Sequence, residues 1–141
     1  MMDPKPYVRR AQYYETDQMG VVHHSNYIRW FEEARVDLLR QFGIDYRDME
    51  NRGIIIPVVD MQCSYLTSVR YDDIVEIRLA LTKYTGVRMF FSYEVRFAES
   101  GTLAATGHST HCFIDPSGKP MGLKRTDAAL HEIFASMVSP E

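Results

Sequence analysis

The chain has 141 residues, 45% of them hydrophobic and 25% charged, which is the balance of one globular domain with a sizeable core. The formal net charge of -3 gives no electrostatic reason to expect nucleic acid or an anionic membrane as a partner. The first ten residues contain no apolar run of the secretory type, and no later segment approaches the length of a membrane span. We therefore expect a single cytoplasmic domain over residues 1–141, without membrane insertion.

The first third of the chain predicts a short strand followed by one long helix. Residues 7–13 form the strand, and Ser25 and Asn26 are good N-caps for the helix. Apolar residues then recur at steps of three and four, the spacing of one helix face. These residues are Tyr27, Phe31, Ala34, Leu38 and Phe42. Gly43 stands where a helix commonly ends.

The rest of the chain predicts an antiparallel sheet. Strands are expected over residues 54–69, 75–81, 89–97 and 103–114, because apolar and polar residues alternate there. Pro57 indicates an irregular or edge position near the start of the first of these strands. The connecting turns are short, which requires antiparallel pairing. A short amphipathic helix near residues 130–137 closes the chain, with Thr126 as its expected cap.

These elements predict an α+β architecture, in which a long central helix is wrapped by a curved antiparallel sheet of about five strands. A sheet with open edges exposes unpaired backbone groups to solvent. Pairing of edge strands between two subunits would hide those groups. We therefore expect a homodimer.

The segment from Tyr13 to Arg35 carries the chemistry. Asp17 lies on a glycine-containing loop shortly before the long helix, whose first N–H groups carry partial positive charge. Such amides can hold the oxyanion that forms when a carbonyl is attacked, and a carboxylate beside them can act as nucleophile or as base for a water. The simpler interpretation is that Asp17 binds only nearby amides, Gly20 is only a turn residue, and Glu15 is a solvated carboxylate.

A thioester suits this small set of groups better than an amide does. An alkyl thiol has a pKa of roughly 8.5, so the thiolate leaves with little help from a general acid. One carboxylate and backbone donors are then sufficient.

Other catalytic patterns are weak. Residues 107–111 read Gly-His-Ser-Thr-His and lack the final glycine of a serine hydrolase elbow. His23 and His24 are adjacent but have no third and fourth metal ligand in view. Cys63 and Cys112 are too few for a zinc pattern or a disulfide framework, and we expect them to be buried and reduced. We therefore expect no metal and no separate cofactor.

One stretch of the chain matches a known signature. The residues Y-Y-E-T-D-Q-M-G-V-V-H-H-S-N-Y from Tyr13 to Tyr27, continued by Phe31-Glu32 and Ala34-Arg35, closely resemble that of 4-hydroxybenzoyl-CoA thioesterase-like hotdog proteins. The likeness is to the bacterial acyl-CoA thioesterase branch and extends over nearly the whole chain. It implies a hotdog fold, dimers that often pair into tetramers, and hydrolysis of an acyl-CoA thioester at the subunit interface, with coenzyme A as part of the substrate.

The same resemblance implies roles for single residues. Asp17 matches the catalytic aspartate of the family. His24 matches a position that acts through its side chain or through its backbone N–H on the thioester carbonyl. Tyr13 matches an aromatic position that supports the site in some members. His23 stands where many relatives carry an aromatic residue, which would alter the acyl pocket.

The phosphates of coenzyme A require cationic side chains at the mouth of the site. Arg70 and Arg88 are the preferred candidates. They are taken from a larger basic set that comprises Arg70, Lys83, Arg88, Lys119, Lys124 and Arg125.

Two further functions fit the same fold. One is a hotdog hydratase or dehydratase acting on acyl thioesters, in which Asp17 and His24 would face the acyl β-carbon. The other is a non-catalytic module that binds acyl-CoA. The sequence also leaves open whether the acyl group is aromatic, short or long, and whether its carrier is coenzyme A or an acyl carrier protein.

Overall fold

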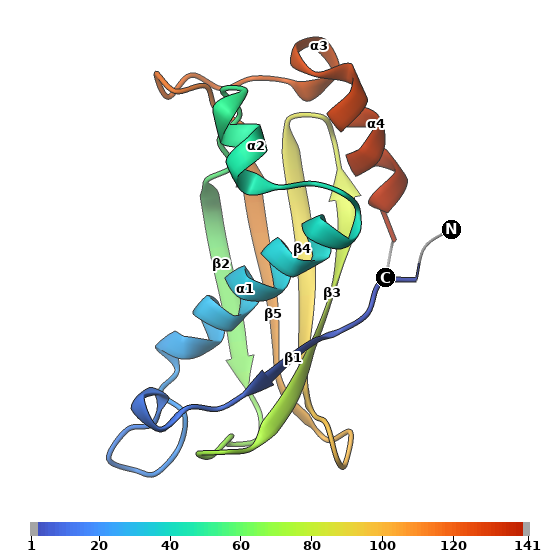
Figure 1. The fold of residues 1–141 in the computed structure, drawn as a ribbon. Helices are drawn as coiled ribbons and strands as arrows, with labels where there is room; N and C mark the ends of the chain where they lie inside the picture. Colours follow the sequence, from blue (N-terminus) through green and yellow to red (C-terminus); the bar gives the residue numbers. More distant parts are fainter. Residues whose placement is uncertain (1–2, 140–141) are drawn as a thin grey trace. The chain divides into compact units, whose positions relative to one another are not determined.

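The computed structural model describes residues 3–139, which form an α+β fold with a five-stranded antiparallel sheet (Figure 1). The elements in chain order are β1 (Tyr7–Arg10), the 3-10 turn η1 (Tyr13–Glu15), α1 (Ser25–Gln41), α2 (Tyr46–Asn51), β2 (Val58–Tyr65), β3 (Ile74–Tyr84), β4 (Arg88–Phe97), β5 (Leu103–Cys112), α3 (Leu123–Thr126) and α4 (Ala128–Met137). The strand order is β1-β3-β4-β5-β2, so the first two strands of the chain form the edges of the sheet.

The predicted architecture is confirmed, including the edge position of the strand after Pro57. Strand β4 shows why the alternation in sequence predicted strands. Its alternate residues Met89, Phe91, Tyr93 and Val95 are at most 2% exposed. A strand with this alternation has one buried and one more exposed face. None of the helices in residues 3–139 has the length and apolar character needed to cross a membrane.

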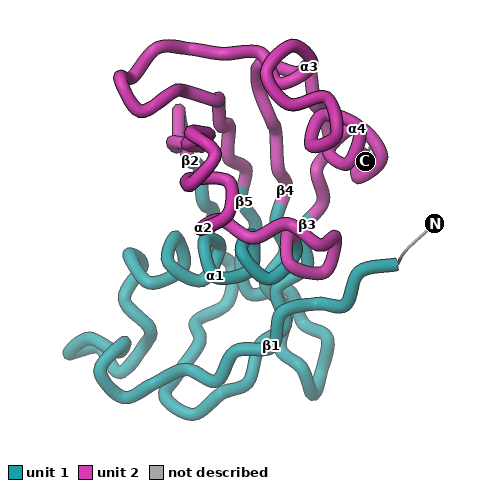
Figure 2. The backbone as a smooth tube through the Cα atoms, turned by 45° about the horizontal axis from the view of Figure 1, so that its top comes forward, with its two compact units in different colours: residues 1–38, 62–79, 93–107 teal, residues 39–61, 80–92, 108–141 magenta. Residues whose placement is uncertain are grey.

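The chain folds into two compact units, and the long strands contribute to both (Figure 2). Unit 1 comprises residues 1–38, 62–79 and 93–107, and unit 2 comprises residues 39–61, 80–92 and 108–141. The two units are described separately below.

The core of unit 1 lies between α1 and the sheet. Trp30, Phe31 and Ala34 follow the helical spacing and are fully buried. The ring of Phe31 stacks on that of Tyr93 in β4, with centroids 4.2 Å apart. Strand β1 pairs antiparallel with β3, with Tyr7 opposite Ile77. This packing fixes the start of α1, where the candidate site lies.

The core of unit 2 is an aromatic cluster that holds helix α4. Tyr84, Phe113 and Phe134 lie within 5.8–6.3 Å of one another, centroid to centroid. The hydroxyl of Tyr84 also lies 2.7 Å from Nδ1 of His131 on α4. Helix α4 is therefore held by both apolar and polar contacts.

The cap expected at Thr126 is wrong, and two short helices were not predicted. Asp127 caps α4, since its carboxylate accepts the N–H of Leu130 at 3.1 Å. Thr126 instead ends the four-residue helix α3. Helix α2 begins after Asp45, whose side chain accepts the N–H of Arg47. Both helices are shorter than the period needed to show an apolar face in sequence.

Candidate active site

Asp17 lies on a tight loop between η1 and α1, within unit 1. The loop is closed by hydrogen bonds from the N–H of Asp17 to the carbonyl of Val21 (2.9 Å) and from the N–H of Gly20 to the carbonyl of Asp17 (3.0 Å). Gly20 has φ +78°, in the left-handed region that glycine adopts without strain. The turn role of Gly20 is thus what presents Asp17.

The carboxylate of Asp17 has one engaged oxygen. Oδ1 accepts the N–H of Met19 at 2.9 Å. No other residue in the described part of the chain hydrogen-bonds this carboxylate. The side chain is half-buried and its second oxygen is available to a ligand.

Asp17 lines a pocket of about 210 Å³ whose walls come from three segments of unit 1. The segments are the loop before α1 (Asp17, Met19, Val21, Val22), the start of α1 (His24, Tyr27) and the end of β2 with the residues after it (Tyr65, Leu66, Thr67, Ser68). The pocket thus combines one carboxylate, one imidazole and four hydroxyl side chains, two of them phenolic, with aliphatic side chains. This is the usual composition of a small-molecule site.

His24 lines the same pocket, and its backbone N–H lies at the start of α1. The neighbouring N–H groups donate within the protein as follows: His23 to the carbonyl of Glu15 (2.8 Å), Ser25 to Nδ1 of His23 (3.2 Å), Asn26 to the carbonyl of His23 (3.0 Å) and Tyr27 to the carbonyl of His24 (3.3 Å). Within residues 3–139, the N–H of His24 donates to no such acceptor. An unpaired amide at a helix start suits a developing negative charge.

Comparison with known proteins assigns the family. Residues 12–131 match the family described as the thioesterase-like superfamily. The chain belongs to the thioesterase-like superfamily.

Several of its relatives are named as hydrolases or thioesterases. The structure of a DHNA-CoA thioesterase from Staphylococcus aureus is 38% identical, with a TM-score of 0.89, and the match covers 94% of this chain and 89% of that chain. The acyl-CoA thioester hydrolase YbgC of Escherichia coli O6:H1 is 29% identical over 121 residues, 85% of this chain and 90% of the relative. A 1,4-dihydroxy-2-naphthoyl-CoA hydrolase of Thermosynechococcus vestitus is 29% identical over 114 residues, 78% of this chain and 77% of the relative.

These comparisons confirm two predictions, the hotdog fold and the class of thioester hydrolase. In this thioesterase-like protein, Asp17 and His24 lie at one pocket, as the signature implied. Their catalytic roles remain predictions.

Tyr13 lies apart from the pocket lining. Its side chain is 78% exposed, and its ring packs edge-on against Tyr71 with centroids 5.5 Å apart. Its carbonyl accepts both the N–H (3.2 Å) and the hydroxyl (2.8 Å) of Thr16, directly before Asp17. Within residues 3–139, the contact of Tyr13 with the Asp17 loop is therefore made by its backbone carbonyl.

His23 is engaged with the helix start. Its Nδ1 lies 2.9 Å from Oγ of Ser25 and also accepts the backbone N–H of Ser25. The ring of His23 therefore caps α1. The rings of His23 and His24 are tilted by 30° to each other, with centroids 4.1 Å apart. Nowhere in residues 3–139 do three or more His, Cys, Asp or Glu side chains gather in a way that could hold a metal ion.

Arg70 and Arg88, the candidates for binding the phosphates of coenzyme A, lie in different units. Nη1 of Arg70 is 3.4 Å from the carbonyl of Gly20, on the loop that carries Asp17. Arg88 begins β4 in unit 2, and its N–H donates to the hydroxyl of Thr85. Arg70 therefore lies beside the loop that carries Asp17.

Tyr65 is a pocket residue that the sequence did not single out. Its hydroxyl donates to the carbonyl of His24 at 3.1 Å, and its ring packs edge-on against Tyr27. Burial raises the pKa of Tyr65 to about 12, and the adjacent Cys63 thiol adds to this rise. The hydroxyl therefore stays protonated near neutral pH. Tyr65 occupies one alternating position of a strand, so nothing in the sequence distinguishes it from its neighbours.

Both cysteines are half-buried, where burial had been expected. Cys63 and Cys112 are free thiols. Burial raises the pKa of the Cys63 thiol, which keeps it protonated and poorly nucleophilic.

Proposed function

We propose that the protein hydrolyses acyl-CoA thioesters, with Asp17 and the backbone N–H of His24 as the catalytic groups. One observation carries this proposal: the same pocket is lined by Asp17, whose carboxylate has one oxygen unengaged, and by His24, whose backbone N–H has no acceptor in residues 3–139. A hydratase would need a proton acceptor and a donor at the acyl β-carbon instead. A binding module would not need an uncompensated amide.

The reaction follows from these two groups. Asp17 removes a proton from a water, whose oxygen attacks the thioester carbonyl carbon. In the alternative route Asp17 itself attacks the carbonyl carbon and displaces the thiolate, which leaves a mixed anhydride on Asp17 that a water then hydrolyses to the free acid. The N–H of His24 stabilises the oxyanion, typically worth about 3 kcal/mol for one such donor. The C–S bond then breaks, and the coenzyme A thiolate leaves without a general acid.

We assign the phosphates of coenzyme A to Arg70, because its guanidinium lies at the loop that carries Asp17. A guanidinium binds phosphate oxygens with paired, charge-assisted hydrogen bonds. Coenzyme A enters as part of the substrate, and the protein needs no other cofactor for this reaction.

We further propose an aromatic acyl group of one or two rings. Tyr27, Tyr65 and His24 form an aromatic wall, with the rings of Tyr27 and Tyr65 5.0 Å apart and edge-on. Relatives named as DHNA-CoA thioesterase and 1,4-dihydroxy-2-naphthoyl-CoA hydrolase act, by name, on aromatic acyl-CoAs of this kind.

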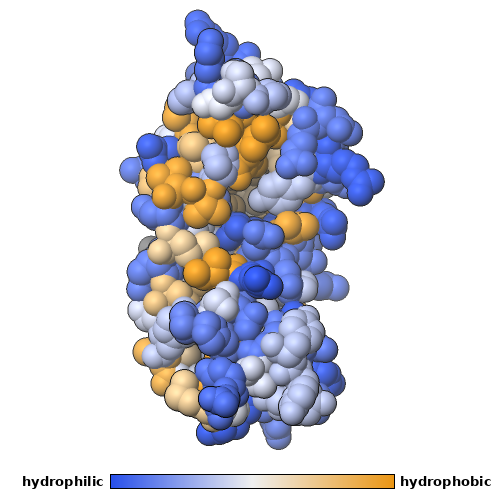
Figure 3. Space-filling model, turned by 90° about the vertical axis from the view of Figure 1, so that its left-hand side faces the viewer, coloured by the Kyte–Doolittle hydropathy of each residue, from blue (hydrophilic) through white to orange (hydrophobic). Residues whose placement is uncertain are grey.

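The working protein in this proposal is a homodimer, which can pair into a tetramer. Two observations support it. Strand β2 is an open edge of the sheet, and Val58 and Val59 on it are 48% and 44% exposed. Hydrophobic surface also gathers on the side of the molecule where β2 lies (Figure 3). An exposed apolar edge strand offers unpaired N–H and C=O groups with which a strand of another chain can pair.

The test of the catalytic assignment is Asp17→Asn. We expect kcat to fall by about 10²- to 10⁴-fold with little change in KM, because the amide keeps the shape but is no base. Released thiol is measured with a thiol-reactive dye over 1,4-dihydroxy-2-naphthoyl-CoA, benzoyl-CoA and palmitoyl-CoA, and the aromatic substrates should be preferred.

The matched control is Asp72→Asn, an exposed aspartate with φ 73°, a conformation that asparagine tolerates well. It loses only an exposed ion pair with Arg10 and should keep the wild-type rate. Wild-type turnover in Asp17→Asn would refute the assignment. Enoyl conversion without thiol release would favour a hydratase, and tight binding without hydrolysis would favour a binding module.

A further inference from the structure

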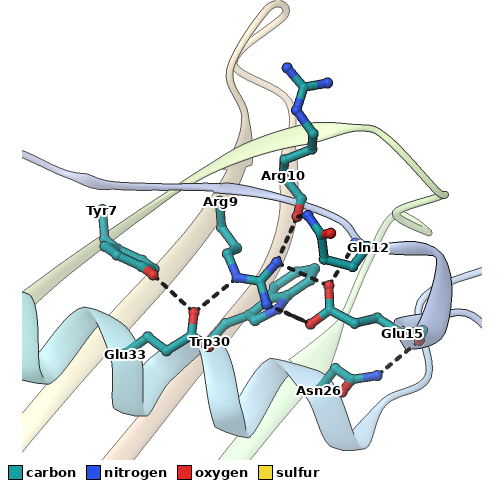
Figure 4. Close-up of polar contacts among 8 residues, drawn as sticks. All are labelled: Tyr7, Arg9, Arg10, Gln12, Glu15, Asn26, Trp30 and Glu33. Carbon is teal, nitrogen blue, oxygen red and sulfur yellow. Dashed lines mark hydrogen bonds and ion pairs between the residues drawn. The ribbon is translucent and has the colours of Figure 1, made fainter.

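Glu15 is a buried carboxylate in unit 1 that the proposed reaction does not use. It is 3% exposed and is the last residue of η1. Oε1 accepts the N–H of Gln12 (2.8 Å) and Nη1 of Arg9 (3.2 Å), and Oε2 accepts Nη2 of Arg9 (2.9 Å) and Nε1 of Trp30 (2.8 Å) (Figure 4). The carboxylate therefore ties η1 to β1 and to α1. The simpler interpretation of Glu15 as a solvated carboxylate is wrong.

The carbonyl of Glu15 joins the two ends of the active-site loop. It accepts the N–H of His23 and Nδ2 of Asn26, each at 2.8 Å. Asp17 follows Glu15 by two residues, and His24 follows His23 directly. One residue thus holds the backbone on both sides of the loop that presents Asp17 and the His24 amide.

We propose that Glu15 is a positioning residue, whose buried carboxylate holds its own carbonyl in place and so sets the spacing between Asp17 and the His24 amide. This inference rests on the proposed function for the roles of these two groups. A carboxylate with four donors, two of them from one guanidinium, is a rigid anchor. Rigidity matters here because a misplacement of about 1 Å can cost roughly 100-fold in rate.

Glu33 provides a matched comparison within the same network. Arg9 also donates through Nε to Oε1 of Glu33 at 2.9 Å, and the hydroxyl of Tyr7 donates to that same oxygen at 3.0 Å (Figure 4). Among the residues that the structure describes, Glu33 makes no hydrogen bond to the loop. The Glu33→Gln and Glu15→Gln variants remove the same charge beside the same arginine, but only Glu15 reaches the loop.

The kinetic test compares Glu15→Gln with Glu33→Gln on benzoyl-CoA. Glutamine keeps the size of Glu15 but turns an NH2 group toward donors, so the anchor is lost. We expect Glu15→Gln to lower kcat by 10- to 100-fold with KM within threefold of wild type, and Glu33→Gln to stay within twofold in both. Trp30→Phe removes a single donor and should give a smaller fall in kcat. It serves as the second variant if Glu15→Gln does not fold.

A structural readout separates this inference from the proposed function. Hydrogen exchange of the His23 and Asp17 amides, measured by NMR, should quicken at least tenfold in Glu15→Gln or Trp30→Phe and stay unchanged in Glu33→Gln. Unchanged exchange and kcat in Glu15→Gln, or an equal fall in kcat in Glu33→Gln, would overturn the positioning role. If Asp17→Asn keeps the wild-type rate, the proposed function fails and the exchange comparison alone decides on Glu15.

Discussion

Gly107 on β5 is glycine because the ring of Phe31 occupies the space of a side chain. A Cβ built on Gly107 would lie 2.6 Å from Cε2 of Phe31 and 2.9 Å from the carbonyl oxygen of Gln62. Both distances are shorter than real Cβ contacts, and the second neighbour is backbone, which cannot move aside cheaply. The close approach lets α1 lie against the sheet within unit 1.

We expect Gly107→Ala to lower the free energy of unfolding by about 1–3 kcal/mol, since one added methyl overpacks this contact. Urea denaturation measures the change. In a double-mutant cycle with Phe31→Leu, the two losses should be less than additive, because the smaller side chain relieves the clash. Strict additivity would show that the Phe31 contact is not the cause.

The sequence predicted which residues around Asp17 form the candidate site. It did not predict which residues hold that site in place. A carboxylate, a turn glycine and a helix start are adjacent in sequence, so their proximity could be predicted. Glu15 contacts Arg9 and Trp30, which come from a strand and from the second turn of the helix. Burial of a glutamate depends on such partners, and charge alone suggests solvent. Tyr65 was not predicted for the same reason, since it contacts His24 from the end of β2, which is distant in sequence.

At the scale of elements, helix α4 is attached to β3 through Tyr84. The hydroxyl of Tyr84 lies 2.7 Å from Nδ1 of His131 on α4, and its ring contacts Phe134. Burial raises the pKa of Tyr84 to about 12, and the charge of Glu132 adds to the rise. The ordinary pKa of a tyrosine is about 10. The native state therefore stabilises the protonated phenol of Tyr84 relative to the phenolate.

The sign of the pH dependence follows from this rise. The stabilisation is fully present below pH ~10, where the unfolded tyrosine is still protonated, and is lost as the pH rises through about 12. We expect Tyr84→Phe to lower the free energy of unfolding by about 1 kcal/mol at pH 8. Between pH 8 and 11 the free energy of unfolding should fall less in this variant than in the wild type. Urea denaturation at the two pH values measures this difference. Tyr14→Phe, at a 77% exposed tyrosine, should behave as the wild type.

Periodicity predicted the long elements and failed on short ones. Helix α1 spans 17 residues and shows its apolar face several times, so both its ends could be predicted closely. Helix α3 has four residues and carries no period. The two candidate caps, Thr126 and Asp127, are adjacent, and only the path of the chain decides between them.

At the scale of the whole molecule, the open edge of the sheet is the feature that one chain leaves unexplained. Strand β2 exposes most of its residues, and its end supplies Tyr65 to the pocket. A second copy paired along β2 would cover Val58 and Val59 and would lie beside the strand that forms one pocket wall. Oligomeric state and activity should therefore change together.

The variant that tests this link is Val59→Lys, because a lysine on an edge strand opposes pairing with another strand. We expect the wild type to be a dimer or a tetramer by light scattering, and Val59→Lys to be a monomer with kcat/KM reduced at least tenfold. Val87→Lys changes a valine that is 47% exposed at the turn between β3 and β4, and it should keep both the assembly and the rate. A fully active monomer, either of the wild type or of Val59→Lys, would show that one chain completes the site by itself.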